Sequence, residues 1–170
     1  MALLGLLQPS REPSTAPLST HQPKAPGTHI GYDPLLIKRL RTDHQRMLEL
    51  YTQTQMLLTT QDYNGVRRKL GELRIILQDH LMTANVKFYI YVSRQLAGDA
   101  EKSALINEYR RDMLSSSREI MDFLRTYSSV RLDDSFANTF QIELLGIGAA
   151  LVQRIEREQT TLFPLYKASY

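Results

Sequence analysis

Apolar residues recur at steps of three and four along most of the chain, which is the period of an amphipathic α-helix. The pattern starts near residue 34 and breaks at three polar segments: TTQDYNG (59–65), LAGDAEKS (96–103) and SSVRLDDS (128–135). The breaks predict four helices, at 34–59, 63–96, 101–127 and 134–167, with aspartates at 62, 99 and 133 or 134 to cap the later starts. Because the connections are short, we expect an all-α fold, an antiparallel up-down-up-down four-helix bundle.

Two charged residues interrupt the apolar stripe of the last predicted helix. Its members follow one another at steps of three and four: Phe136, Phe140, Leu144, Ile147, Leu151, Arg154, Glu158, Leu162 and Leu165. The same spacing places His44 on the inner face of the first helix and His80 on that of the second. On the third helix it turns inward Leu105, Tyr109, Ser116 and Ile120. The four faces together predict a buried polar cluster of His44, His80, Tyr109, Arg154 and Glu158.

Length and composition suit a single soluble domain. The 170 residues are enough for one core and leave no room for a second catalytic domain. Six of the seven prolines fall within the first 34 residues, among Ser, Thr and Gly, so we expect a disordered arm at 1–32 and the bundle at 33–168. The first leucines lack a preceding basic segment, which argues against a signal peptide. The chain has no cysteine and no run approaching the roughly 18 apolar residues of a membrane span, so we expect a cytoplasmic protein.

Four segments of the chain resemble the four helices of the hemerythrin-like (HHE) family, an antiparallel bundle that holds a non-haem di-iron centre. In order, they are DHQRMLELY, LQDHLMTANVKFY, LINEYRRDML and LVQRIEREQTTLFPLY. The resemblance implies that His44, His80 and Glu158 match family ligands. It also implies that Ala84 stands where the family has a Glu, and that Tyr109 and Arg154 stand where it has a His.

A second resemblance is closer over the second to fourth helices. The segments FQIELLGIGAALVQRIERE, SREIMDF and LQDHLMTANVKFY are similar to the regulator-of-sigma-D anti-sigma family, which shares this bundle without a di-iron site and binds the housekeeping sigma factor. The strongest part of the match is Phe140, Gln141, Leu144, Ile147, Gly148, Ala150, Leu151, Arg154 and Glu158. It implies a protein partner, either a sigma factor or another signalling protein, and a role in transcription.

The charged pair leads to our main hypothesis, a degenerate metal site. A di-iron centre needs about five or six histidine and carboxylate ligands, and the ions would repel a guanidinium beside them. We therefore expect Arg154 to replace the metal's positive charge and to pair with Glu158 one turn away. The predicted function is a non-catalytic regulatory module without a cofactor, which acts by binding another protein.

The alternative hypothesis keeps a metal. His44, His80 and Glu158 form the two-histidine, one-carboxylate set that suits a single Fe(II) or Zn(II) ion, with Tyr109 as a further oxygen donor. This hypothesis predicts a hemerythrin-like protein that binds iron or oxygen through a reduced site. His21 and His29 lie in the predicted arm and are assigned no role.

Other functions find less support in the sequence. It contains no Gly-rich phosphate loop and no Gly-x-Ser-x-Gly motif, so we do not predict an enzyme. The net charge is +3, and the basic groups at 37–41, 66–69 and 109–111 lie at separate helix positions, which favours solvated surface over nucleic-acid binding. The segment FYIYV (88–92) is too apolar all round for a surface helix. Either an interface or burial would explain it, and we expect burial.

Overall fold

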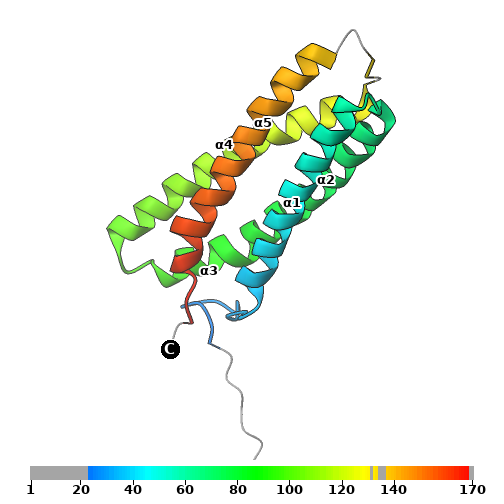
Figure 1. Cartoon of the computed structure of the whole chain (residues 1–170). Coiled ribbons are helices and arrows are strands. Elements are labelled where there is room, and N and C mark those ends of the chain that lie inside the picture. The colour runs from blue at the N-terminus through cyan, green and yellow to red at the C-terminus, as the bar shows by residue number, and fades with distance from the viewer. Residues whose placement is uncertain (1–22, 131, 134–136, 169–170) are drawn as a thin grey trace, which may run out of the picture.

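The computed structural model describes residues 23–130, 132–133 and 137–168. They form an all-helical bundle, shown in Figure 1. Its long helices are α1 (Leu36–Thr59), α2 (Tyr63–Thr83), α4 (Ala100–Ser129) and α5 (Ala137–Arg157). Helix α1 contacts α2 and α5, and α4 contacts the same two, so α1 and α4 lie across the diagonal. The predicted antiparallel four-helix bundle is confirmed, and none of the described helices has the length and hydropathy needed to cross a membrane.

Two of the four predicted helices change their winding before they end. The second continues from α2 through the π-helix η1 (Ala84–Tyr89) into α3 (Ile90–Gln95). The fourth continues from α5 through the π-helix η2 (Glu158–Leu162) and the 3₁₀ turn η3 (Phe163–Leu165). A π-helical turn holds an extra residue, so it shifts which side chains face inward, and such turns are frequent at functional sites. After η1 begins, four residues of FYIYV are buried, Phe88, Tyr89, Tyr91 and Val92, which confirms the expected burial of this segment.

Aspartates cap two of the helices, as the sequence predicts. The Asp62 side chain accepts a hydrogen bond from the Gly65 backbone N–H at the start of α2. Asp99 accepts one from the Lys102 backbone N–H at the start of α4. The predicted start of the fourth helix, at 134–136, lies outside the described residues. The caps satisfy backbone donors that have no partner within the helix.

The bundle interior divides into three levels. Each of the four helical segments, counted with the η1–α3 or η2–η3 continuation where there is one, contributes apolar residues to two clusters and at least one polar residue between them. The first, called here the apolar cluster, is built around Met47, Leu50, Leu70, Leu73, Leu77, Ile120, Leu124, Phe140, Leu144 and Leu151. The second, called the aromatic cluster, is built around Leu36, Leu40, Phe88, Tyr91, Ile106, Leu162, Phe163 and Tyr166. The polar layer between them holds His44, His80, Ser117, Arg154 and Glu158, all buried.

A glycine permits close contact between α1 and α5 in the apolar cluster. A Cβ atom at Gly148 would lie 2.1 Å from the hydroxyl oxygen of Tyr51. No side chain fits at that distance, so glycine lets the tyrosine ring lie against the backbone of α5.

The inner face of the third predicted helix differs from the prediction. Leu105 is exposed, and Tyr109 and Ser116 are only half-buried. The residues that face inward are Ile106, Met113, Ser117 and Ile120. Apolar residues are sparse along α4, so two helical phases one residue apart fit the pattern almost equally, and packing against α2 and α5 selects the other one.

The structure places residues 23–32 differently from the predicted disordered arm. Ala25 is buried, and the Tyr32 backbone N–H donates to the Pro23 carbonyl at 2.6 Å. The Tyr32 ring stacks on Tyr166, with centroids 5.0 Å apart. This segment therefore closes the aromatic end of the bundle, where the N-terminal segment and the end of the last helix meet in Figure 1. The rest of the predicted arm, residues 1–22, lies outside the described residues.

Candidate functional site

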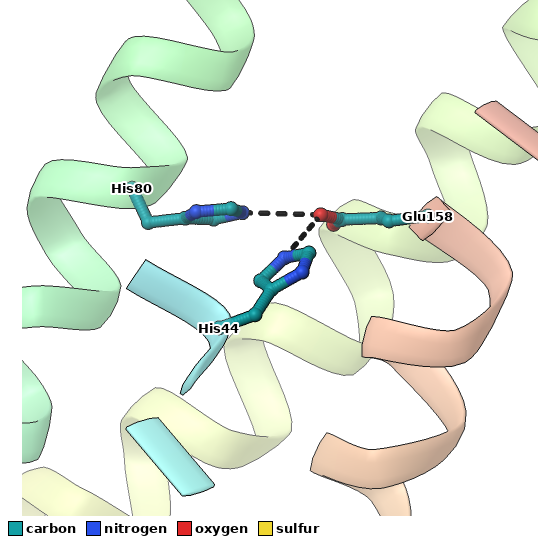
Figure 2. A group of neighbouring side chains, drawn as sticks. All are labelled: His44, His80 and Glu158. Atoms are coloured by element: carbon teal, nitrogen blue, oxygen red, sulfur yellow. Dashed lines mark hydrogen bonds and ion pairs between the residues drawn. The ribbon is translucent and has the colours of Figure 1, made fainter. Parts of the chain in front are cut away.

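Two histidines and a glutamate converge in the polar layer, as Figure 2 shows. His44 Nε2 lies 2.9 Å from Glu158 Oε2, and His80 Nε2 lies 3.1 Å from the same oxygen. One ligand atom from each of the three residues lies within 4.8 Å of the other two. All three residues are at most 2% exposed, so the group is shielded from bulk water. They come from α1, α2 and the first residue of η2.

Arg154 holds the other oxygen of the glutamate. Its Nη2 lies 2.5 Å from Glu158 Oε1, one helical turn away. Its Nη1 donates to the Met113 carbonyl at 2.6 Å and to Ser117 Oγ at 2.7 Å. The guanidinium is thus tied to α4 while it neutralises the carboxylate, and Oε2 is left to the two histidines. Arg154 is 3% exposed, so this ion pair is not screened by solvent.

His80 lies between two carboxylates. Its Nδ1 is 3.4 Å from Asp43 Oδ2, and its Nε2 faces Glu158. Burial alone lowers the pKa of His80, but Asp43 and Glu158 outweigh it and raise that pKa above the ordinary value. With His80 protonated, its charge and that of Arg154 balance the two carboxylates.

Asp43 links this buried group to solvent. Its side chain is 36% exposed, and it lines an open groove of about 490 Å³ between α1 and the α2–η1 segment. The groove is also lined by Leu35, Lys38, Arg39, Thr42, Asp79, Thr83 and Lys87.

His44 has a different environment. Its Nδ1 lies 3.1 Å from the amide nitrogen of Gln159, and its ring stacks on Phe163 with the planes 7° apart. Burial lowers the pKa of His44 below the ordinary value, although its hydrogen bond to Glu158 acts in the opposite direction. The two histidines therefore differ in charge, with His44 neutral under conditions that keep His80 protonated.

Glu158 stays ionised despite its burial. Desolvation alone would raise the pKa of the carboxyl, but the hydrogen bonds from His44 and His80 and the charge of Arg154 hold that pKa well below its usual range. The carboxylate is the common partner of His44, His80 and Arg154, so its loss would leave Arg154 without its counter-ion.

A buried tyrosine also lies within electrostatic range of the group. Tyr89 is 3% exposed, and its hydroxyl has no hydrogen-bond partner among the described residues. Burial and the charge of Glu158 raise the pKa of Tyr89 far above the ordinary value, so the phenol stays protonated. Its O–H is a donor available to another molecule.

The structure brings together four of the five residues of the predicted polar cluster. Tyr109 is the exception, because its ring packs under the Arg157 guanidinium, 5.1 Å from the centroid, and does not reach the group. Ala84 is buried one turn beyond His80, and its methyl group is part of the aromatic cluster.

Three residues at the site were not expected from the sequence: Asp43, Gln159 and Tyr89. Asp43 and Gln159 directly follow or precede an inward-facing residue of the same helix, and helical periodicity assigns such neighbours to the solvent side. The sequence signal for Asp43 and Gln159 was their position directly beside His44 and Glu158 in the chain.

The three donors can hold one metal ion. Donor atoms about 2.0–2.1 Å from a tetrahedral ion lie about 3.3 Å from each other. The observed separations of 2.9 and 3.1 Å between the histidine nitrogens and Oε2 differ from that value by a few tenths of an ångström. All three donor atoms lie within 4.8 Å of one another, so small side-chain shifts would let two imidazoles and one carboxylate oxygen hold a single ion. Arg154 does not obstruct this arrangement, because it contacts the opposite oxygen of Glu158.

The fold and the site together define the class of protein, an antiparallel four-helix bundle with a histidine–carboxylate group suited to a cation in its interior. The family model of the hemerythrin HHE cation binding domain matches residues 35–166. The chain therefore belongs to the hemerythrin HHE family, as its four helical segments suggest. The curated proteins and the solved structures contain no significant match to it.

Proposed function

We propose that this hemerythrin-like protein binds one divalent transition-metal ion, iron or zinc, through His44, His80 and Glu158. The observation that carries the proposal is the convergence of both Nε2 atoms on a single carboxylate oxygen in a fully buried site. Two histidines and one carboxylate form a ligand set typical of mononuclear iron and zinc sites. Tyr109, expected from the sequence as a further oxygen donor, packs under Arg157 and is not one of the proposed ligands.

The charges around the group favour one ion over two. A dinuclear centre needs about five or six donors and bridging carboxylates. Among the described residues, the donor group has three members, and Arg154 already occupies the second oxygen of its carboxylate. The fixed positive charge of Arg154 would repel a second cation at that side. In this sense we propose that the di-iron site typical of the family is reduced here.

The surrounding residues support binding rather than catalysis. An ion held by three protein ligands would have at least one coordination position left. It could bind an outside ligand there, such as dioxygen or water. The Tyr89 hydroxyl is a buried donor without a partner among the described residues, and it lies within electrostatic range of Glu158. Arg154 cannot exchange its proton at ordinary pH, and the aromatic cluster excludes water on one side. We therefore infer no enzymatic role.

Metal content per chain tests this proposal. Untagged protein made in iron-supplemented medium should contain about one ion per chain by elemental mass spectrometry, and His44→Gln or His80→Gln should contain almost none. His29→Gln is the matched control, because His29 is exposed and lies outside the group. Added metal at about 100 times its Kd should stabilise the wild type by about 2.7 kcal/mol in thermal unfolding.

Either of two results would contradict the proposal. If wild-type protein neither contains metal nor is stabilised by added Fe²⁺, Co²⁺ or Zn²⁺, the group is structural. A content of about two ions per chain would mean that further ligands exist and that the single-ion site is wrong.

A second candidate function is a regulatory protein that binds a partner such as the housekeeping sigma factor. The observation in its favour is the outer face of α5, where Ile142, Leu145 and Val152 are 72%, 52% and 49% exposed. No charged residue occurs at positions 144–153, although the exposed faces of soluble helices are usually charged. Apolar surface of this kind is typical of protein interfaces. The charge balance of the polar layer also allows a stable fold without metal.

Binding of purified housekeeping sigma factor, measured by calorimetry, tests this second function. Leu145→Glu should abolish binding, because it places a charge in the apolar face. Met56→Glu is the control, since Met56 is also an exposed apolar residue, 64% exposed, but lies on α1. If wild-type protein does not bind sigma factor, or if both variants bind as it does, the proposed partner or surface is wrong.

A further inference from the structure

The orientation of the Gln159 amide is determined by Arg41. Arg41 Nη1 donates to Gln159 Oε1 at 3.3 Å, which identifies that end of the amide as the acceptor. The other end, Nε2, therefore faces His44 Nδ1 at 3.1 Å and can only donate to it. Arg41 is further held by its position over the Phe163 ring, 5.6 Å from the centroid.

This contact determines which nitrogen of His44 carries the hydrogen. Because Nδ1 accepts from Gln159, a neutral His44 must carry its hydrogen on Nε2. That Nε2–H donates to Glu158 Oε2, 2.9 Å away. The arrangement satisfies every polar atom of the imidazole, but it places a hydrogen where a metal ion would bind.

His80 has an outer partner of the opposite kind. Asp43 Oδ2, which can only accept, lies 3.4 Å from Nδ1 of His80, and Nε2 of His80 donates to Glu158 Oε2 at 3.1 Å. A carboxylate behind a ligating histidine is a common means of fixing its tautomer. The two histidines thus have outer partners of opposite hydrogen-bonding character.

We propose that Gln159, oriented by Arg41, is a positioning residue that keeps His44 in its Nε2–H tautomer and thereby weakens metal binding at this site. The part that concerns metal rests on the function proposed above. For His44 to bind through Nε2, the amide must turn over and present Oε1 to Nδ1. One hydrogen then leaves Nε2 and one is taken up at Nδ1, so the imidazole stays neutral. The turn costs the amide its bond with Arg41, and metal affinity is lowered accordingly.

Nitrogen NMR of the metal-free protein tests the tautomer directly. With ¹⁵N-labelled histidine, the wild type should show His44 Nδ1 as a bare accepting nitrogen and Nε2 as an N–H. In Gln159→Glu the side chain offers no donor, so Nδ1 should acquire a hydrogen. A wild-type spectrum with the hydrogen on Nδ1 would overturn the proposal. If Gln159 had only a structural role, Gln159→Glu would leave the hydrogen of His44 on Nε2, as in the wild type.

Metal affinity tests the consequence. By competition with a chelating dye at pH 8, Gln159→Glu should bind Co²⁺ about 10-fold tighter or more, the size of effect known for partners of ligating histidines. Arg41→Met should also bind more tightly, because it releases the amide. Equal or weaker binding by both variants would sink the inference.

Two control variants separate this effect from simple changes of charge. Gln45→Glu adds a carboxylate on the exposed side of α1, and Arg46→Met removes an exposed positive charge from the same helix. Both should bind Co²⁺ as the wild type does. The outcomes are also distinguishable from a failure of the metal-binding function, because the NMR result does not need any metal to bind.

Discussion

The apolar cluster and the polar layer are built from the same four helices, about one turn apart. Along α5 and into the first residue of η2, the inward stripe passes from Leu144 and Leu151 to Arg154 and Glu158 at steps of three and four. The Leu side chains bury surface without any required direction. The charged side chains need partners at fixed positions, and these come from α1, α2 and α4.

The difference shows how each level responds to change. In the apolar cluster, the loss of one side chain removes contacts and leaves a cavity, and the remaining residues keep their packing. In the polar layer, the loss of one side chain leaves a buried charge without its partner. The free-energy cost of that unpaired charge is larger than the net stabilisation that the intact pair provides. The polar layer is therefore a weak source of net stability.

The largest expected effect comes from breaking the buried ion pair in metal-free protein. Arg154→Leu or Glu158→Leu alone should lower the free energy of unfolding by about 3–5 kcal/mol, because each leaves an uncompensated charge. The double variant Arg154→Leu/Glu158→Leu should recover most of that loss. Urea unfolding with intrinsic tyrosine fluorescence measures all three. A double variant no more stable than the single ones would show that the pair is not the source of the loss.

A cavity in the apolar cluster should destabilise the fold by a comparable or smaller amount. That loss should not depend on any charged group. Leu73→Ala, at a residue that is 1% exposed, should lower the free energy of unfolding by about 2–5 kcal/mol. The loss should be the same at pH 5.5 and pH 8 and should not depend on added metal. A marked pH dependence of this loss would mean that packing in the apolar cluster is coupled to the charges of the polar layer.

The smallest effect is expected where the polar layer reaches solvent. Asp43→Asn removes the partner that, with Glu158, raises the pKa of His80 against the effects of burial and Arg154. A raised pKa in the folded state contributes stability at pH values below the unfolded pKa of about 6.5, and the contribution is lost as pH rises through the folded value. The difference between wild type and variant should be about 1 kcal/mol at pH 5.5, since Asp43 is partly exposed, and should shrink above pH 7.

The control for that prediction is Asp79→Asn. Asp79 lines the same groove but is not paired with His80. Its replacement should leave the pH profile of stability in metal-free protein unchanged. A constant difference for Asp43→Asn across the pH range would show that the carboxylate acts on something other than the charge of His80.

The periodicity of the sequence determined the fold and most of the polar layer. Steps of three and four placed four polar residues on inner faces: His44, His80, Arg154 and Glu158. Because the inner faces of a bundle pack against each other, these side chains meet in its interior. The aspartate caps at the starts of α2 and α4 and the burial of FYIYV also follow from local residue types, because each depends on neighbours within a few positions.

What the tertiary structure decided is the pairing within the layer. Ser117 rather than Tyr109 faces the site because packing selected one of two phases of α4 that fit the sequence nearly equally. Asp43 and Gln159 sit beside inward residues, where helical periodicity predicts solvent, and only the positions of neighbouring helices bring them to His80 and His44. Hydrogen bonds between side chains depend on distances of tenths of an ångström between segments far apart in the chain. A one-dimensional pattern carries no such information, so the sequence determined which residues meet and the packing decided how they bond.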